Sequence, residues 1–278
     1  MISGQTRLLA LIGHPIVHSL SPAFQNAALE EMALPFVYMA FDVPSEHLAA
    51  SVAGLRALGA AGFNVTVPHK EKVIPYLDHL DITTTVLQAV NTVVIREGKL
   101  VGYNTDVEGL KVTLQKTNYT PGEPVCLLGA GGAARAVLYA LIHLSGGPVT
   151  VFNRNRDRAE SLRDWVRASL NREITIESWE SFVEGKSAFL DKTRVLINAT
   201  SLGLADELPP IPWDALSQCH SIIDTVYRRD DTPLVREARK RGFLACDGKT
   251  MLIGQGAASF TLFTGWRAPV ELMERALL

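Results

Sequence analysis

Short apolar runs rich in Val, Ile and Leu alternate with amphipathic segments of helical length along almost the whole chain. This alternation is typical of βα units arranged around a mostly parallel sheet. The fold class it predicts is therefore α/β. In the first part of the chain it predicts strands at 8–12, 37–41 and 63–67, helices at 22–32 and 46–58, a hairpin that turns at Glu97-Gly98, and a helix at 107–116.

The alternation restarts after residues 117–124, a segment with two prolines and no periodicity that we expect to join two domains. Six strands with intervening helices follow, the number found in a dinucleotide-binding fold. The stretch 248–278 has a helical pattern and no strand of its own, so we expect it to pack back on the first domain. The six strands are predicted at 125–128, 149–152, 174–176, 195–199, 222–226 and 243–246.

Composition narrows the class of protein. The 278 residues are 47% apolar and 20% charged, with 27 Lys and Arg against 29 Asp and Glu. Such a chain is typical of a globular protein and has no broad basic face for a nucleic acid. Its apolar runs are too short for a signal peptide or a membrane span. Three cysteines, an odd number without CxxC spacing, indicate reduced thiols and a cytoplasmic protein.

A glycine-rich turn lies between a predicted strand and a predicted helix. In VCLLGAGGAARAVL, Gly129, Gly131 and Ala134 match the pattern G-x-G-x-x-A. Glycines let backbone N–H groups approach a pyrophosphate, and the helix N-terminus adds the positive end of its dipole. A lone glycine-rich turn is more often an ordinary loop, but the strand before it and the helix after it favour a dinucleotide site.

The end of the next strand indicates which dinucleotide is bound. An NAD site usually has an acidic residue there to hold the ribose 2′-hydroxyl, whereas Arg suits a 2′-phosphate. The arginines here favour NADP, while Asp157 and the mixed charges beyond it leave NAD, or a simple solvated helix start, as alternatives. The residues that follow this strand are Asn153, Arg154, Asn155, Arg156, Asp157 and Arg158.

Polar residues also follow a strand of the first domain. FNVTVPHK puts Asn64, Thr66 and Lys70 at or beyond the strand end, where open α/β sheets bind ligands. GYNTDVEG puts Asp106 between the hairpin and the next helix. A Lys beside an Asp is a workable proton-transfer pair. Residue type alone favours a simpler interpretation, in which the lysine is a surface residue and the aspartate caps the helix.

Two serines precede the first predicted helix. In GHPIVHSLSP, Ser19 and Ser21 can place hydroxyls and backbone amides around a carboxylate. His14 and His18 do not share a helix face because Pro15 lies between them, so no metal site is predicted. A serine-hydrolase triad is not favoured either, because the chain has no G-x-S-x-G elbow.

Seven segments in order resemble the signatures of the shikimate dehydrogenase family. The resemblance implies a substrate-binding catalytic domain at 1–109 and 248–278 and a Rossmann dinucleotide-binding domain at 110–247. It also implies reversible, NADPH-dependent reduction of 3-dehydroshikimate to shikimate in aromatic amino acid biosynthesis. The segments are IGHPIVHSLSP, GFNVTVPHK, AVNT, GYNTDVEG, GAGGAARA, INATSLGL and MLIGQGAASF.

The resemblance also implies roles for individual residues. Lys70 and Asp106 match the catalytic pair, with Lys70 as the proton donor and acceptor. The substrate carboxylate is held by residues matching Ser19 and Ser21, with Tyr227 nearby. The ring hydroxyls are surrounded by residues matching Asn64, Thr66, Asn91 and Gln255. The cofactor positions are Gly129, Ala130, Gly131, Gly132 and Ala133 at the pyrophosphate, Asn153, Arg154 and Arg158 at the 2′-phosphate, and Thr225 and Gly248 beside the nicotinamide.

Four residues depart from the usual family pattern: Gln25 replaces a frequent His, Gln88 a glycine, Asn155 a frequent Thr, and Thr225 a larger apolar residue. Gln88 and Thr225 leave open a paralogue that acts on quinate or a related polyol acid. A non-catalytic sensor of such ligands is a third hypothesis, against which the presence of both residues of the catalytic pair argues. The expected partner is a small molecule, bound by a monomer or homodimer.

Overall fold

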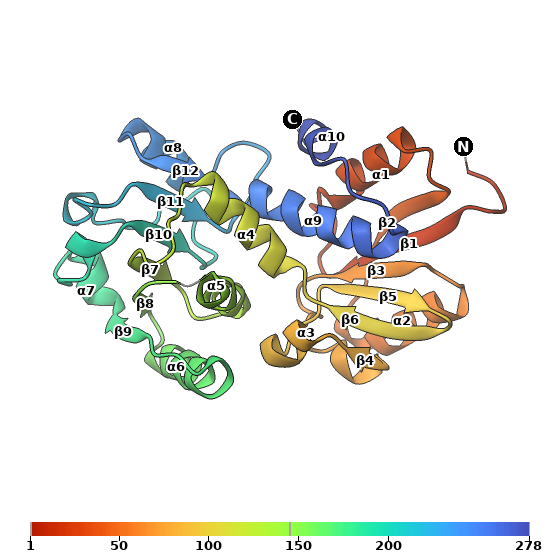
Figure 1. Cartoon of the computed structure of the whole chain (residues 1–278), viewed down its shortest axis with the longest axis horizontal. Helices are drawn as coiled ribbons and strands as arrows, with labels where there is room; N and C mark the ends of the chain where they lie inside the picture. Colours follow the sequence, from red (N-terminus) through yellow and green to blue (C-terminus); the bar gives the residue numbers. More distant parts are fainter. Residues whose placement is uncertain (1, 145, 278) are drawn as a thin grey trace. The chain divides into compact units, whose positions relative to one another are not determined.

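The computed structural model describes residues 2–144 and 146–277, which form two compact α/β units (Figure 1). The first comprises the described residues up to Asp106 and from Leu252 onward, and the second is Val107–Met251. The chain passes between them at the start of helix α4 (Asp106–Lys116) and within helix α9 (Gly248–Thr264). The expectation that 117–124 joins the domains was wrong, because this segment lies inside the second unit and forms a turn there.

The first unit is built on a six-stranded mixed sheet in the order β2-β1-β3-β5-β6-β4. β1 (Arg7–Gly13) pairs in parallel with β2 and β3, and β5 and β6 form the predicted hairpin. Glu97 and Gly98 at its turn both have positive φ, as a tight hairpin turn requires. The other elements are α1 (Ser21–Glu31), β2 (Phe36–Asp42), α2 (Leu48–Ala57), β3 (Gly62–Val65), β4 (His79–Leu80), α3 (Ile82–Leu87), β5 (Thr92–Arg96), β6 (Lys99–Tyr103) and α10 (Val270–Arg275).

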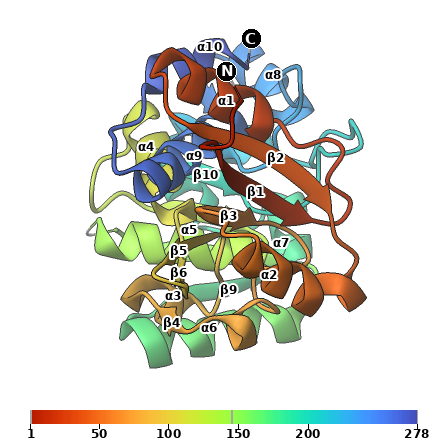
Figure 2. The same cartoon turned by 90° about the vertical axis from the view of Figure 1, so that its right-hand side faces the viewer.

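Helices cover both faces of this sheet. Leu48, Val52 and Leu55 of α2 pack against one face, in a buried cluster with Ile12 and Phe63. Successive strand residues point to opposite faces, so Gly62 faces the other side, where the ring of Phe263 from α9 covers it. At the sheet edge, α1 packs against β2 and lies beside α10 (Figure 2). The chain from Leu252 onward, which contains most of α9 and all of α10, thus completes the first unit.

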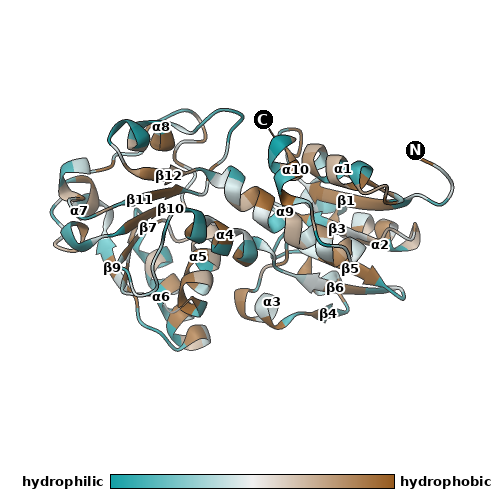
Figure 3. Ribbon diagram, turned by 45° about the horizontal axis from the view of Figure 1, so that its top comes forward, coloured by the Kyte–Doolittle hydropathy of each residue, from teal (hydrophilic) through white to brown (hydrophobic). Residues whose placement is uncertain are grey.

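The second unit is built on a parallel sheet in the order β12-β11-β10-β7-β8-β9. Counted from its own first strand, this is the 3-2-1-4-5-6 order of a doubly wound dinucleotide-binding fold, with the direction of numbering reversed. Strands such as β7 and β10 are buried along their whole length, because helices cover both faces (Figure 3). Its elements are β7 (Val125–Leu128), α5 (Gly132–His143), β8 (Val149–Asn153), α6 (Arg156–Leu170), β9 (Thr175–Ser178), α7 (Trp179–Val183), β10 (Val195–Asn198), β11 (Ser221–Asp224), α8 (Pro233–Lys240) and β12 (Leu244–Cys246).

All strands predicted for both units are present. β4 and α3 were not predicted, because a two-residue strand and a six-residue helix are too short to show a period. Within residues 2–144 and 146–277, no helix is both long and apolar enough to cross a lipid bilayer. The cysteines, Cys126, Cys219 and Cys246, are free thiols.

The contact between Gly62 and Phe263 predicts that a methyl group added at Gly62 destabilises the fold. A Cβ at Gly62 would lie 2.6 Å from both the Phe263 ring and the Val93 carbonyl oxygen. Gly62→Ala is therefore expected to lower the free energy of unfolding by about 1 to 3 kcal/mol, the usual cost of overpacking a core. Urea unfolding measures this change.

Gly54→Ala in α2 is the matched control, because a Cβ there meets nothing within 4 Å. Alanine favours a helix, so this variant should be unchanged or about 0.5 to 1 kcal/mol more stable. If Gly62→Ala unfolds at the same urea concentration as the wild-type protein, the Phe263 ring does not hold α9 against the sheet.

Candidate active site

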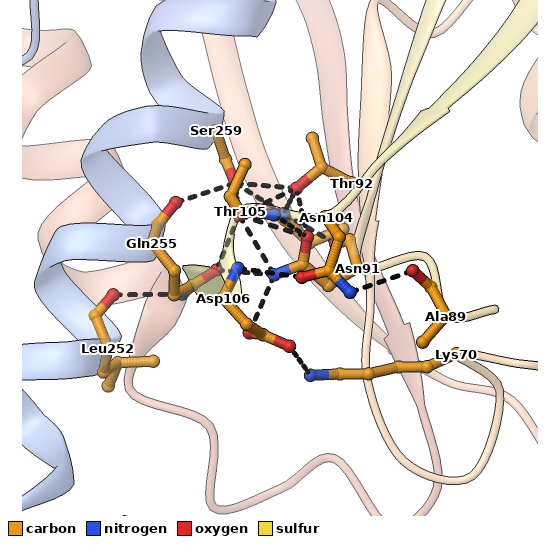
Figure 4. A network of polar contacts seen from close by, with 11 residues as sticks. Lys70, Ala89, Asn91, Thr92, Asn104, Thr105, Asp106, Leu252, Gln255 and Ser259 are labelled. Atoms are coloured by element: carbon orange, nitrogen blue, oxygen red, sulfur yellow. Dashed lines mark hydrogen bonds and ion pairs between the residues drawn. The ribbon is translucent and has the colours of Figure 1, made fainter. Parts of the chain in front are cut away.

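Lys70 and Asp106, the predicted proton-transfer pair, lie together in the first unit (Figure 4). Lys70 Nζ donates a hydrogen bond to Asp106 Oδ2 at 2.7 Å, and the two side chains are 31% and 13% exposed. The backbone N–H of Val90 donates to the Lys70 carbonyl at 2.8 Å, which holds the lysine beside Asn91. The simpler interpretation, a surface lysine and a capping aspartate, does not describe this geometry, because the two side chains are paired with each other.

The side chain of Asn91 fixes the Asp106 carboxylate. It is 3% exposed, and its Nδ2 donates to Asp106 Oδ1 at 2.9 Å and to Thr105 Oγ1 at 3.0 Å. Its Oδ1 accepts the backbone N–H of Thr105 at 2.8 Å. Gln255 Oε1 of α9 lies 3.4 Å from Asn91 Nδ2. The structure therefore brings four predicted site residues, Lys70, Asn91, Asp106 and Gln255, into one network.

A buried layer of polar side chains, Tyr38, Asn64, Thr92 and Ser259, supports this network. Asn64 Nδ2 lies 2.9 Å from Thr92 Oγ1, 3.0 Å from Ser259 Oγ and 3.0 Å from the Asn91 carbonyl. Asn64 Oδ1 accepts the Tyr38 hydroxyl at 2.8 Å. Every polar group of the Asn64 side chain is thus engaged within the protein, which keeps Asn91 in place.

Sequence reasoning missed Tyr38, Thr92 and Ser259. A signal existed for Ser259, which follows Gln255 by four residues on α9 and therefore shares its helix face. Thr92 immediately follows Asn91 but points to the buried layer. Tyr38 gives no local signal, because an aromatic residue in a strand is expected in any core.

The two serines lie at the start of α1. Ser19 Oγ accepts the N–H of Ser21 at 3.3 Å, and Ser21 is 7% exposed. Burial raises the pKa of Tyr38, and a side-chain hydrogen bond with Ser21 partly offsets this rise. Tyr38 therefore connects Ser21 with Asn64. Thr66 lies against Gly13, where any Cβ would collide with the Thr66 methyl group.

The glycine-rich turn of the second unit fits a pyrophosphate. Gly129 has a φ of 104°, and a Cβ there would lie 2.8 Å from the Ala199 carbonyl oxygen. At Gly131 and Gly132, by contrast, a Cβ would meet nothing within 4 Å. α5 begins at Gly132 without a side-chain cap, so the N–H groups of its first turn, including Ala133, have no partner within the helix. Bare backbone and unpaired N–H groups are what an anion requires here.

The end of β8 presents positive charge. Asn153 Nδ2 donates to the Asn155 carbonyl at 2.6 Å, and Asn155 caps α6 by accepting the N–H of Arg158 at 2.9 Å. Arg154 and Arg158 are exposed and form no ion pair in the described part of the chain, whereas Arg156 pairs with Glu160. Two uncompensated guanidinium groups at this strand end fit a 2′-phosphate.

Thr225, Tyr227 and Gly248 share one region of the second unit. The Gly248 N–H donates to the Val226 carbonyl at 2.9 Å, and a Cβ at Gly248 would lie 2.5 Å from the Thr225 carbonyl oxygen. Only glycine fits this close approach. Burial raises the pKa of the half-buried Tyr227. The predicted nearness of Tyr227 to the serines joins residues of different units and stays a prediction.

Two departures from the family pattern have local explanations. Gln88 ends α3 in the left-handed conformation, with φ 53°, which is why glycine suits this position. Its side chain is exposed and donates to the Thr85 carbonyl at 2.6 Å, within its own helix. Gln25 is buried, and its Nε2 donates to the Gly256 carbonyl of α9 at 2.9 Å. Neither residue has a hydrogen bond to Lys70 or Asp106 among those of the described chain.

Comparisons with known proteins find relatives in sequence and in structure that match almost the whole chain. Residues 11–93 match the shikimate dehydrogenase substrate binding domain, and residues 248–278 the shikimate 5′-dehydrogenase C-terminal domain. Shikimate dehydrogenase (NADP(+)) of Methanopyrus kandleri is 41% identical over 285 residues, covering 100% of this chain and 97% of the relative. Shikimate 5-dehydrogenase from Thermus thermophilus, in complex with NADP(H) and shikimate, has a TM-score of 0.86 and 35% identity, covering 98% of both chains. Quinate dehydrogenase from Corynebacterium glutamicum, in complex with NAD, has a TM-score of 0.88 and 30% identity, covering 98% of both chains.

The fold and the site define a two-domain, dinucleotide-dependent oxidoreductase. Its sequence matches those of curated relatives at nearly full length on both sides. The chain belongs to the shikimate dehydrogenase family.

A buried aspartate supports the sheet edge beside Thr225. Asp224 Oδ1 accepts from Asn198 Nδ2 at 2.9 Å and from the Val226 N–H at 3.1 Å, and Oδ2 accepts from Thr232 at 2.7 Å. Despite these bonds, burial raises the pKa of Asp224 from 3.8 to about 6. Its charged form is therefore less favourable in the folded protein than in the unfolded chain.

This raised pKa predicts a pH dependence of stability. Because the folded protein binds the Asp224 proton more tightly, the contribution of this group is fully present below pH 3.8 and is lost as pH rises through about 6. Relative to Asp224→Asn, the wild-type protein should lose up to about 3 kcal/mol across this window. Denaturant unfolding of both proteins from pH 4 to 7 measures the difference. Parallel curves would show that Asp224 titrates as an ordinary carboxylate.

Proposed function

We propose that this protein is an NADP-dependent shikimate dehydrogenase, which interconverts shikimate and 3-dehydroshikimate in aromatic amino acid biosynthesis. The observation that carries the proposal is the Lys70–Asp106 pair, held by the buried Asn91 in a chain that matches shikimate dehydrogenases from end to end. We assign the substrate to the first unit and the dinucleotide to the second. When bound, NADP supplies the acceptor for the hydride that leaves the carbinol carbon.

Lys70 handles the proton of the reacting hydroxyl. One of its three Nζ hydrogens is directed to Asp106, which leaves the others free to face a substrate oxygen. In the reduction direction the Nζ ammonium gives one proton to the forming alkoxide and becomes a neutral amine, and in the oxidation direction the neutral amine takes up the hydroxyl proton as the hydride leaves. Asp106, which already accepts hydrogen bonds from Lys70 and Asn91, keeps Nζ in place and accepts a further one from the substrate.

The remaining side chains of the first unit bind and orient the substrate. Ser19 and Ser21 hold its carboxylate at the start of α1. Thr66, Asn91 and Gln255 surround the ring hydroxyls. The polar groups of the Asn64 side chain are already hydrogen-bonded within the protein. Asn64 therefore acts indirectly, by keeping Asn91 in position to bind the ring hydroxyls.

The second unit binds NADP. The segment from Gly129 to Ala133 takes the pyrophosphate, and Thr225 and Gly248 lie at the nicotinamide. Asn153, Arg154 and Arg158 bind the 2′-phosphate, which makes NADP preferred over NAD. We place the enzyme in the cytoplasm, as a monomer or homodimer.

One alternative is supported by an observation. The structure resembles that of a quinate dehydrogenase about as closely as those of shikimate dehydrogenases, so the fold does not separate the two substrates. Two departures from the family pattern, Gln88 and Thr225, suggested quinate as the substrate. The Gln88 side chain hydrogen-bonds its own helix, so Thr225 is the departure that still supports this alternative. A sensor would need no proton-transfer pair, and the intact pair of Lys70 and Asp106 argues for an enzyme.

Steady-state oxidation of shikimate and of quinate, each with NADP and with NAD, tests the proposal. Shikimate with NADP is expected to give the highest kcat/KM, with quinate about 10- to 100-fold lower because it fits the same hydroxyl contacts less well. Higher kcat/KM for quinate would assign the protein to the alternative. Absence of turnover with all four combinations would contradict an enzymatic function.

Replacement of Lys70 separates proton transfer from binding. Lys70→Ala should lower kcat by about 10² to 10⁴-fold, the usual contribution of a positioned acid or base, with little change in the Kd for shikimate or NADP. Lys70→Met, which keeps the side-chain volume, should be equally slow. Single-turnover NADPH absorbance and equilibrium titration measure the two quantities.

Lys72→Ala is the matched control, because Lys72 is exposed and its Nζ hydrogen-bonds only Ser45 among the described residues. Its kcat should equal that of the wild-type enzyme. If Lys70→Ala keeps the wild-type kcat and loses only affinity, Lys70 is a binding residue and another group transfers the proton.

A further inference from the structure

The guanidinium of Arg154 lies on the face of an aromatic ring. Arg154 Cζ is 5.3 Å from the ring centroid of Trp179, within the range of a cation–π interaction. Arg154 is exposed and forms no ion pair among residues 2–144 and 146–277. The indole is therefore the group that the structure offers to orient this otherwise free side chain.

Strand register explains why the two residues meet. β8 and β9 are parallel neighbours, and Asn153 at the end of β8 pairs with Ser178 at the end of β9. Arg154 and Trp179 each follow one member of this pair, so they leave the sheet side by side at its carboxyl edge. The Asn153 and Asn155 side chains close the turn around Arg154, which fixes where its side chain begins.

Trp179 is itself anchored in the core. Its ring lies 5.4 Å from the ring of Phe182, which is fully buried and lies 5.2 Å from Phe152 of β8. The Ser178 side chain caps the helix that Trp179 begins, by accepting the Ser181 N–H at 3.1 Å. The indole is thus a fixed platform, whereas a free arginine at this position would sample many rotamers.

We propose that Trp179 is a positioning residue for cofactor choice: it holds the Arg154 guanidinium at the carboxyl edge of β8, where the 2′-phosphate of NADP is read. This inference rests on the proposed function, because it requires the 2′-phosphate to bind at this edge. Pre-orientation removes part of the ordering cost of a charge-assisted contact. Trp179 therefore strengthens binding of the 2′-phosphate specifically and contributes little to the rest of the dinucleotide.

Equilibrium titration of the full chain with two pairs of probes tests the proposal without turnover. The pairs are NADP⁺ with NAD⁺, and adenosine 2′,5′-bisphosphate with AMP, whose members differ only in the 2′-phosphate. Trp179→Leu should weaken NADP⁺ and the bisphosphate by about 2- to 5-fold, as expected for loss of an exposed cation–π contact, and change NAD⁺ and AMP by less than about 1.5-fold. Trp179→Phe, which keeps an aromatic face, should recover most of the loss.

A double-mutant cycle with Arg154→Ala shows whether Trp179 acts through Arg154. Arg154→Ala alone should weaken the 2′-phosphorylated probes, and adding Trp179→Leu should weaken them no further. Losses that multiply in the double variant, or Trp179→Leu losses equal for both members of each pair, would overturn the proposal. If Trp179→Leu does not fold, Trp179→Met replaces it in the same cycle.

Trp213→Leu is the matched control. Trp213 lies under Arg241 at 4.9 Å and beside Phe243, which precedes β12, so it belongs to the opposite edge of the same sheet. Its loss should leave the ratio of NADP⁺ to NAD⁺ affinity unchanged. Failure of the proposed function would appear differently, as a wild-type protein that prefers NADP⁺ in titration but does not oxidise shikimate.

Discussion

Burial of the Asn91 side chain is the constraint on which the candidate active site depends. A buried amide must find partners for its oxygen and both its hydrogens, because each polar group left unpaired costs about 1 to 3 kcal/mol. Asn91 finds them in the Thr105 backbone, the Thr105 hydroxyl and the Asp106 carboxylate. Moving Asp106 would unpair an atom in the core, so the position of the Asp106 carboxylate is as fixed as the core itself. Lys70 is exposed enough to contact a substrate, and its hydrogen bond to Asp106 fixes the position of its Nζ.

The two units prepare their ligand sites in different ways. The first relies on side chains that satisfy one another in layers, from Tyr38 through Asn64 to Asn91, so that its polar groups point in fixed directions. The second relies on backbone that is left bare, at Gly131 and Gly132, and on side chains placed by strand register. A small, hydroxyl-rich substrate requires the first arrangement, whereas a long dinucleotide with charged phosphates requires the second.

Most of the architecture was predictable because it is encoded locally. Buried parallel strands such as β7 and β10 are continuous apolar runs, and the turn at Gly129 has its chemistry within a few residues. The break at 117–124 was misleading, because prolines mark a turn equally well inside a domain and between domains. The roles assigned to single residues came from the family resemblance and stay proposals, although the structure does gather Lys70, Asn91, Asp106 and Gln255.

What the sequence could not predict is contact between distant segments. Ser259 and Asn64 are 195 residues apart, and their hydrogen bond exists only because α9 returns to the first sheet. Trp179 meets Arg154 only because of the register between two strands, which neither strand reveals alone. Each of these residues has an ordinary local interpretation, as a polar helix residue, a core aromatic or a surface cation. Their contacts with distant residues, which arise only in the folded protein, distinguish them from ordinary residues of the same types.

The return of α9 to the first sheet also sets an order of assembly. The second unit is continuous in sequence, whereas the first needs residues from both sides of it. A ribosome delivers the chain from its N-terminus, so the strand that contains Gly62 emerges before the second unit, and Phe263, which covers it, emerges after that unit. Until then one apolar face of the first sheet has no native partner, while the second unit is already complete. During synthesis this face is therefore exposed apolar surface, of the kind that chaperones bind, and a chain that stops before Leu252 lacks the helix that covers it.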